Sequence, residues 1–278
     1  TRGDEVSRKP EQIFDEVARL AEQGVSEITF LGQNVNSYKM PYKSRILRLS
    51  DLIEIISHID GIERIRYTTS HPLDMTDDLI EAYQYIPQLV SQLHLPVQSG
   101  SNRILEKMKR NYTIDIFHDA VQRIKTFRPD LRVSSDFIVG FPGESHNDFM
   151  ETMDLVNEIE FDSSFSFIYS KRPGTPASKL DDNTTLDEKK ERLSMLQDRL
   201  NFFHRNHSKN MVGSIQRCLV TGIAKKSPNQ LQARTECNRV VNFDFENIGF
   251  IGKLVDIKIT EALSYSLLGT LHNPRGKI

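Results

Sequence analysis

The stretch Leu93–Tyr112, LHLPVQSGSNRILEKMKRNY, decides the fold. Up to Val97, leucine and valine alternate with polar or ring residues, a period of two that is typical of a β-strand. From Asn102 onward the apolar residues recur three and four positions apart, as on one face of a helix. The turn between them, residues 98–101 (QSGS), supplies an amide, two hydroxyls and a glycine. In α/β folds ligands bind at the carboxyl ends of strands, so this turn either caps the helix or faces a ligand.

The same alternation of helix and strand runs through the first two thirds of the chain. Strands are predicted at residues 27–33, 64–69, 93–97, 131–140 and 163–169, each preceded by a helix. Such alternation predicts a parallel sheet with right-handed crossovers. The helix that opens at Pro10 has no strand before it, so we expect the first strand upstream of Thr1. The fold class is α/β, a partial (β/α)6 TIM-like barrel that lacks its first strand.

The sequence pattern changes from helical to β at Met211, after a long charged helix that begins with the capping box Thr185–Glu188. Five short β segments follow, at residues 214–222, 231–235, 239–243, 251–260 and 265–271. This spacing predicts a small all-β barrel of the OB type, a common binder of single-stranded nucleic acid. We therefore divide the chain into domains 1–210 and 211–272.

Basic residues gather in and just before this second domain. Between Asn201 and Val240 a single acid, Glu236, accompanies seven basic residues: Arg205, Lys209, Arg217, Lys225, Lys226, Arg234 and Arg239. This excess of basic residues is suited to binding a phosphate backbone. The alternative is a solvated β surface with no nucleic-acid partner. Over the whole chain the net charge is −2, which argues against a uniformly basic coat.

Several classes of protein are disfavoured by composition. The chain has two cysteines, too few for a disulfide framework, and no apolar run long enough to span a membrane, which together favour the cytoplasm. It has neither a GxxxxGK[ST] loop nor a GxGxxG turn for a nucleotide. His204, His207, Cys218 and Cys237 lack the spacing of a metal site, so we interpret them as structural.

Polar residues follow four of the predicted strands, which favours a shared cavity over scattered helix caps. They are Gln33 and Asn34, Ser70 and His71, Gln98 and Ser99, and Tyr169 and Ser170. Asp136 is the one acid inside an otherwise apolar strand. Its burial is costly without a partner, which is either a ligand or a nearby backbone N–H group.

Taken together, six motifs resemble the radical S-adenosylmethionine methylthiotransferases. They are, in the family's order, TRGDEVSR (1–8), LGQNVNSY (31–38), TTSHP (68–72), the stretch 93–112, DFIVGFPGE (136–144) and YSKRPGTPA (169–177). Residues 211–271 resemble the RNA-binding TRAM domain that ends such proteins. The motifs favour the branch that adds a methylthio group to isopentenyl-adenosine beside the tRNA anticodon. The branch that acts on threonylcarbamoyl-adenosine shares the QSGS turn, and a non-catalytic RNA-binding module is a further alternative.

The resemblance implies a binding site for S-adenosylmethionine. It places the amino-acid end of the cofactor at Gln33 and Asn34, its ribose or methionine groups at Ser70, Gln98 and Ser99 near Asp136, and its adenine at Ile138 and Tyr169. It also assigns tRNA phosphates to Arg217, Lys225, Lys226, Arg234 and Arg239.

The family's two 4Fe–4S clusters have no ligands in this chain. The family's CxxxCxxC motif normally precedes TRG, and this sequence begins at TRG, so we expect the cluster ligands upstream of Thr1. Thr1, Arg2 and Arg8 would follow that loop. The resemblance implies an anticodon stem-loop as substrate and an electron donor as partner, and it predicts that residues 1–278 alone are inactive.

Overall fold

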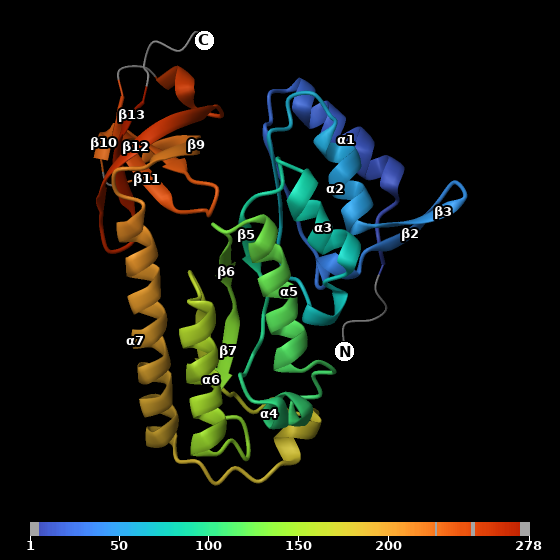
Figure 1. Ribbon diagram of the computed structural model, residues 1–278, viewed down its shortest axis with the longest axis vertical. Coiled ribbons are helices and arrows are strands. Elements are labelled where there is room, and N and C mark those ends of the chain that lie inside the picture. The colour runs from blue at the N-terminus through green and yellow to red at the C-terminus, as the bar shows by residue number, and fades with distance from the viewer. Residues whose placement is uncertain (1–5, 226, 246–247, 273–278) are drawn as a thin grey trace.

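The computed structural model describes residues 6–225, 227–245 and 248–272, and it consists of an α/β part followed by a small β-barrel (Figure 1). The α/β part contains α1 (Pro10–Glu22), β1 (Glu27–Phe30), β2 (Lys39–Tyr42), β3 (Arg45–Arg48), α2 (Leu49–Ser57), β4 (Arg64–Tyr67), α3 (Asp77–Tyr85), β5 (Gln92–His94), α4 (Asn102–Lys107), α5 (Ile114–Phe127), β6 (Arg132–Ser134), β7 (Asp136–Val139), α6 (His146–Ile159) and β8 (Phe165–Ile168). Short 3-10 turns lie at Val35–Ser37, Pro72–Asp74, Pro176–Lys179 and Ile248–Phe250.

The strands of the α/β part are parallel, apart from a β2–β3 hairpin. β1 pairs with β4, β5 with β6 and β7 with β8. Single bridges, Ile65 to Leu89 and Gln98 to Phe137, connect these pairs into one array that runs from β1 to β8. The helices pack on one face of the array, where Phe117, Phe137 and Phe149 are fully buried. The predicted α/β fold of a partial barrel is confirmed; a strand before Thr1 stays a prediction.

Two local features differ from the sequence prediction. The strand predicted at 131–140 is divided into β6 and β7 at Ser135, whose hydroxyl donates to the Leu95 carbonyl (2.8 Å) and accepts from the Val97 amide (2.9 Å). The β2–β3 hairpin was not predicted. Its turn contains Lys43 at φ 52°, a left-handed conformation that glycine or asparagine usually signals.

The C-terminal barrel is closed, in the order β10-β11-β13-β12-β9. Its strands are β9 (Ile215–Ala224), β10 (Ser227–Arg234), β11 (Val240–Asp244), β12 (Leu254–Ala262) and β13 (Leu267–Leu271). Alternate residues form a core of their own around Val220, Leu231 and Phe243. The predicted five-stranded barrel is confirmed.

A single helix, α7 (Leu186–Asn210), connects the two parts and runs beside α6 (Figure 1). The predicted capping box at its start is present, since the Thr185 hydroxyl accepts from the Glu188 amide and the Glu188 carboxylate accepts from the Thr185 amide. Along the part of the chain that the structure describes, no helix is long and apolar enough to cross a membrane.

Candidate functional site

The segments after β1 and β4 lie side by side at the carboxyl end of the array. The Val35 amide donates to the Thr69 carbonyl (3.0 Å), which brings Asn34 and Ser70 to neighbouring strand ends. The Asn34 side-chain NH2 group donates to Asp74 (2.6 Å), whereas Gln33 is exposed. The sequence prediction that these polar residues share one end of the sheet therefore agrees with their positions.

The turn after β5 is joined in the same way to β7. The Gln98 amide donates to the Asp136 carbonyl and the Ile138 amide donates to the Gln98 carbonyl, both at 2.9 Å. The Tyr169 amide donates to the Val139 carbonyl (2.9 Å), so the end of β8 lies beside the end of β7. Gln98 thus lies beside Asp136 and Ile138 of β7, and Tyr169 lies beside Val139 at the carboxyl end of the same strand.

An aromatic contact connects these two groups of strand ends. His71, next to Ser70, packs edge-on against Tyr112 with ring centroids 5.2 Å apart. The Tyr112 hydroxyl donates to the Val97 carbonyl (3.0 Å), directly before Gln98. Packed tertiary contacts therefore run between the β1–β4 ends and the β5–β8 ends.

Unpaired buried oxygens mark the same positions. Among the described residues, four buried side-chain oxygens have no hydrogen-bond partner: Ser26 Oγ, Asn34 Oδ1, Ser70 Oγ and the Tyr169 hydroxyl. An unpaired buried polar group is costly and is rare in folded proteins. Three of the four belong to residues that the sequence assigned to the cofactor. These atoms are suited to hydrogen bonds with a polar ligand, so the residues present fit S-adenosylmethionine.

Ser99 occupies a different place from the one expected. Its side chain is 0% exposed, and its hydroxyl accepts from the Ser101 amide (3.2 Å) and lies 3.4 Å from the Thr152 hydroxyl. The hydroxyl therefore closes the turn from within, and we withdraw Ser99 as a direct ligand of the cofactor.

His94 is a functional candidate that the sequence reasoning missed. Its Nδ1 atom lies 3.0 Å from the Ser134 hydroxyl, and its Nε2 atom lies 3.8 Å from Asp136 Oδ1. The Asp136 side chain is 32% exposed, so this acid is less buried than its apolar strand suggested. The signal was available, because the alternation that buries Leu93 puts His94 on the opposite face of the strand.

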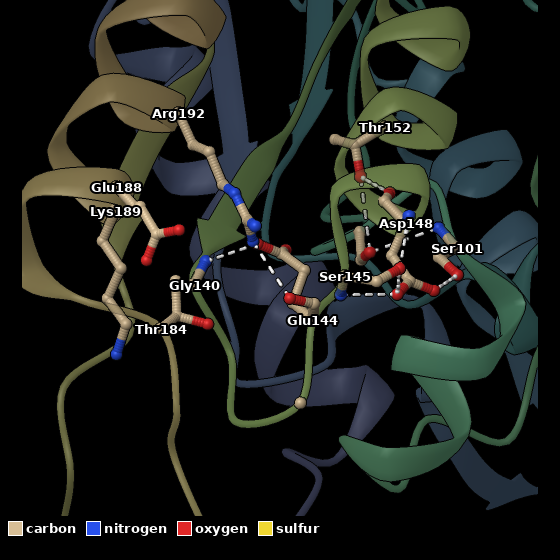
Figure 2. A network of polar contacts seen from close by, with 12 residues as sticks. Ser101, Gly140, Glu144, Ser145, Asp148, Thr152, Thr184, Glu188, Lys189 and Arg192 are labelled. Carbon is tan, nitrogen blue, oxygen red and sulfur yellow. Dashed lines mark hydrogen bonds and ion pairs between the residues drawn. The ribbon is translucent and has the colours of Figure 1, made fainter.

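The loop after β7 is stabilised by a buried carboxylate. Glu144 accepts hydrogen bonds from the Gly140 amide (2.8 Å) and from Arg192 of α7 (2.7 Å), as Figure 2 shows. Burial raises the pKa of Glu144 above its ordinary value, although both of these donors act in the opposite direction. Gly140 has φ 67°, and a Cβ atom there would lie 2.5 Å from the Lys189 side chain, so α7 also restricts this loop.

A cavity of about 630 Å³ lies between α1 and β1. Gln33 and Asn34 line it, together with Arg8 and apolar side chains of α1 and β1. In the described part of the chain β1 pairs with β4 alone, so its other edge borders this cavity. The remaining cofactor candidates lie outside its lining.

The residues assigned to tRNA phosphates differ in exposure. Lys225 and Arg217 are exposed, and Arg217 forms an ion pair with Glu63. Arg234 is half-buried and donates to the Asn238 carbonyl (3.0 Å). Lys226 lies outside the described residues, as do Thr1 and Arg2. Arg239 is a correction, because it is only 6% exposed and cannot reach a phosphate backbone.

Arg239 instead joins the small barrel to the α/β part. Its two terminal nitrogens donate to the two carboxylate oxygens of Asp162, each at 2.6 Å, and its Nε atom donates to Ser208 (2.9 Å). Glu236, next to this turn, accepts from the Ser91 amide (2.6 Å). Arg66 of β4 donates to the Glu236 carbonyl (2.9 Å). Arg64 of β4 donates to the Arg234 carbonyl (3.3 Å). We call Asp162, Arg239, Ser208, Glu236, Ser91, Arg64 and Arg66 the interdomain latch.

The described residues do not fit an iron–sulfur cluster. Within them, no group of three or more His, Cys, Asp or Glu side chains is placed to hold a metal. Cys218 is buried in β9, and burial raises the pKa of its thiol to about 12. A neutral, buried thiol is a poor metal ligand.

Comparison with known proteins agrees with these features. A model of the radical SAM superfamily matches residues 1–156, more than half of the chain. The chain belongs to the radical SAM superfamily. A TRAM domain model matches residues 209–272 of this radical SAM protein, over the closed barrel.

Two relatives illustrate the similarity. The tRNA-2-methylthio-N(6)-dimethylallyladenosine synthase of Hahella chejuensis is 54% identical over 270 residues, which are 97% of this chain and 60% of the relative. The protein of the same name from Chromohalobacter salexigens is 54% identical over 276 residues, 99% of this chain and 62% of the relative. The chain thus spans about three fifths of the length of the curated relatives that it matches.

A solved structure supports the fold alone. The coproporphyrinogen III oxidase of Escherichia coli, a radical SAM enzyme, superposes with a TM-score of 0.50 at 13% sequence identity, over 84% of this chain and 62% of that chain.

Proposed function

We propose that this chain is the cofactor- and RNA-binding part of a tRNA methylthiotransferase that modifies isopentenyl-adenosine beside the anticodon. The observation that carries the proposal is the set of unpaired buried oxygens on Asn34, Ser70 and Tyr169, in a radical SAM chain that ends in a TRAM domain. Relatives at 54% identity are named for this modification. We keep 1–210 and 211–272 as the two domains.

The proposed seat of S-adenosylmethionine is the row of strand ends. Gln33 and Asn34 would hold the amino-acid end, Ser70 and Gln98 the ribose or methionine groups, and Asp136 a further polar group. Ile138 and Tyr169 would border the adenine. The chemistry available from bound S-adenosylmethionine is radical hydrogen abstraction and methyl transfer. The part of these residues is to bind and orient the cofactor and to exclude water.

The proposed RNA surface consists of Arg217, Lys225, Lys226 and Arg234 on the C-terminal barrel. Contacts from such residues to phosphates supply affinity without reading the sequence. Cys218 and Cys237 do not form a binding site for an iron–sulfur cluster with the other described residues. We therefore propose that residues 1–278 alone do not catalyse the reaction. An electron donor is a further proposed partner of the complete protein. We also propose that the complete protein is located in the cytoplasm.

The unpaired oxygens provide a test in the complete protein. Ser70→Ala and Tyr169→Phe each remove one such oxygen and should weaken S-adenosylmethionine binding about tenfold, the value of one hydrogen bond of about 1.4 kcal/mol. Isothermal titration calorimetry measures the affinity. Ser26→Ala is the matched control, because Ser26 Oγ is also buried and unpaired but precedes β1. Equal affinities for all three variants would refute the proposed seat.

Mass spectrometry of nucleosides from treated tRNA tests the substrate. Appearance of 2-methylthio-isopentenyl-adenosine supports the proposal. The QSGS turn (residues 98–101) is shared with the branch that modifies threonylcarbamoyl-adenosine, so a methylthio group on that nucleoside alone would favour this second function. Binding of tRNA without any modified product would favour an RNA-binding module.

A further inference from the structure

The Gln98–Ser101 turn is held by helix α6 as well as by the sheet. The Gly100 amide donates to the Thr152 hydroxyl (2.9 Å), and this hydroxyl donates in turn to the Asp148 carbonyl one helical turn earlier (3.3 Å). A Cβ atom at position 100 would lie 2.5 Å from both the Glu151 carbonyl oxygen and Thr152 Cα. The backbone of the turn therefore lies directly against the backbone of α6, and only glycine fits there.

Asp148 holds the far end of the same turn. Its Oδ1 atom accepts from the Ser101 hydroxyl (2.7 Å) and from Arg103 Nε (3.0 Å), while Oδ2 accepts from the Ser145 amide (2.7 Å), as Figure 2 shows in part. Burial by itself would raise the pKa of Asp148. The hydrogen bonds from Arg103, Ser145 and Ser101 outweigh burial and hold this pKa well below its ordinary value. Asp148 is thus ionised at neutral pH, and its hydrogen bonds tie the start of α4 to the start of α6.

We call Asp148, Thr152, Ser99, Ser101 and Arg103 the clamp. The residue that this clamp fixes is Gln98. Its φ angle is 69°, in the left-handed region that costs a residue other than glycine of order 1 kcal/mol, and such strain persists only where the surroundings enforce it. Its own backbone bonds to Asp136 and Ile138 hold one side of the turn. Thr152 and Asp148 hold the other side, directly after Gln98.

Helix capping alone does not account for these contacts. Asp148 completes the capping box of α6 with Ser145, which would be satisfied without Ser101 or Arg103. Thr152 lies in the second turn of the helix, and its hydroxyl is the acceptor for an otherwise unpaired buried amide. Thr152 and Asp148 are 3% and 4% exposed, so neither side chain is accessible to RNA or to a ligand in solution.

We propose that Thr152 and Asp148 are positioning residues, which hold the Gln98–Ser101 turn in the strained conformation that presents Gln98 to S-adenosylmethionine. This inference rests on the proposed function. It extends the site from the strand ends to helix α6, and it accounts for the burial of Ser99, whose hydroxyl belongs to the clamp.

Thr152→Val provides the sharpest test, because valine keeps the shape of threonine and removes only the hydroxyl. In the complete protein we expect about tenfold weaker binding of S-adenosylhomocysteine by calorimetry, since the Gly100 amide loses its acceptor and the turn shifts. Affinity for an anticodon stem-loop should stay within twofold. Thr152→Ser retains the hydroxyl and should restore cofactor affinity. Thr126→Val, at an exposed position on α5, is the matched control.

Asp148→Asn is the second variant, with the exposed Asp154→Asn of the same helix as its control. It should weaken cofactor binding and raise hydrogen exchange at residues 98–101, while circular dichroism shows a folded protein. Unchanged cofactor affinity in Thr152→Val, or an equal loss of cofactor and RNA affinity, would overturn the inference. If the unsubstituted protein fails to bind S-adenosylhomocysteine, the proposed function itself fails.

Discussion

The clamp around Asp148 and the interdomain latch around Asp162 use the same chemistry for different purposes. Each is a buried carboxylate that accepts hydrogen bonds from an arginine. Asp148 also accepts from the Ser101 hydroxyl, whereas Asp162 lies 3.0 Å from His204 Nδ1. In the clamp the arginine, Arg103, has a side chain that is 47% exposed, whereas the Arg239 side chain of the latch is 5% exposed. The charge of Arg103 is therefore partly solvated, and the main role of the clamp is to hold the Gln98–Ser101 turn in one conformation. In the latch both charges are desolvated, and each depends on the other.

The two networks also lie at opposite ends of the strands. The clamp holds a turn that follows β5, at the carboxyl end of the array. The latch includes Arg64 and Arg66 in β4 and Ser91 just before β5, toward the amino end of the array. Figure 1 shows the small barrel at this end, with α7 reaching from it along α6. We infer that removing one partner costs more stability in the latch than in the clamp, because both latch charges are desolvated.

Breaking the latch should have the largest effect. Arg239→Met leaves the Asp162 carboxylate buried without its main partner, and we expect the free energy of unfolding to fall by about 3–5 kcal/mol. Urea unfolding followed by circular dichroism measures it. The double variant Asp162→Leu, Arg239→Met should recover most of the loss, and exposed Arg205→Met should change little. A loss below about 1 kcal/mol would contradict our view of the latch.

Crowding the clamp should come second. Gly100→Ala places a methyl group against the backbone of α6, and we expect a destabilisation of about 3 kcal/mol together with a displaced turn. Gly32→Ala is the control, because its Cβ atom would meet its nearest neighbour at an ordinary 3.5 Å. Similar stabilities for the two variants would show that the turn adapts easily.

The latch should also respond to pH. Burial alone would raise the pKa of Asp162, but the hydrogen bond from His204 and the charge of Arg239 outweigh it and lower this pKa to about 2. Because the pKa is depressed on folding, the stabilisation of about 2 kcal/mol is complete above about pH 4 and is lost as the pH falls toward 2. Asp162→Asn should flatten the unfolding free energy over this range. A profile as steep as that of the unsubstituted protein would mean that other carboxyls dominate.

The smallest effect on stability is expected at the proposed RNA surface, which belongs to neither network. Lys225→Ala should change the unfolding free energy by less than about 0.5 kcal/mol, as exposed substitutions usually do. It should nevertheless weaken binding of an anticodon stem-loop and reduce the salt dependence, d log K/d log[salt], by about 1. Fluorescence anisotropy at several salt concentrations measures both. Lys43→Ala, in the distant β2–β3 hairpin, is the control, and an equal salt slope in both variants would exclude Lys225 from the RNA surface.

The sequence by itself determined the local structure and led to the proposed site. The Thr185–Glu188 capping box, the parallel strands and the five-stranded barrel all follow from residues within a few positions of one another. The preference of ligands for the carboxyl ends of strands led to Asn34, Ser70 and Tyr169, whose side-chain oxygens are unpaired in the structure. The predictions of secondary structure hold because helix caps and strand alternation depend on neighbours in the chain. The assignment of these oxygens to the cofactor stays a proposal.

Only the tertiary structure decided which partner each polar residue takes. Arg239 resembles a surface base in the sequence, but its partner Asp162 lies 77 positions earlier. Ser99 resembles a ligand, but Thr152 of α6 buries it. The β2–β3 hairpin turns at Lys43 without the usual glycine. Burial and pairing depend on which segments meet in space, and a charge or hydroxyl looks the same in the sequence whether water or a distant side chain satisfies it.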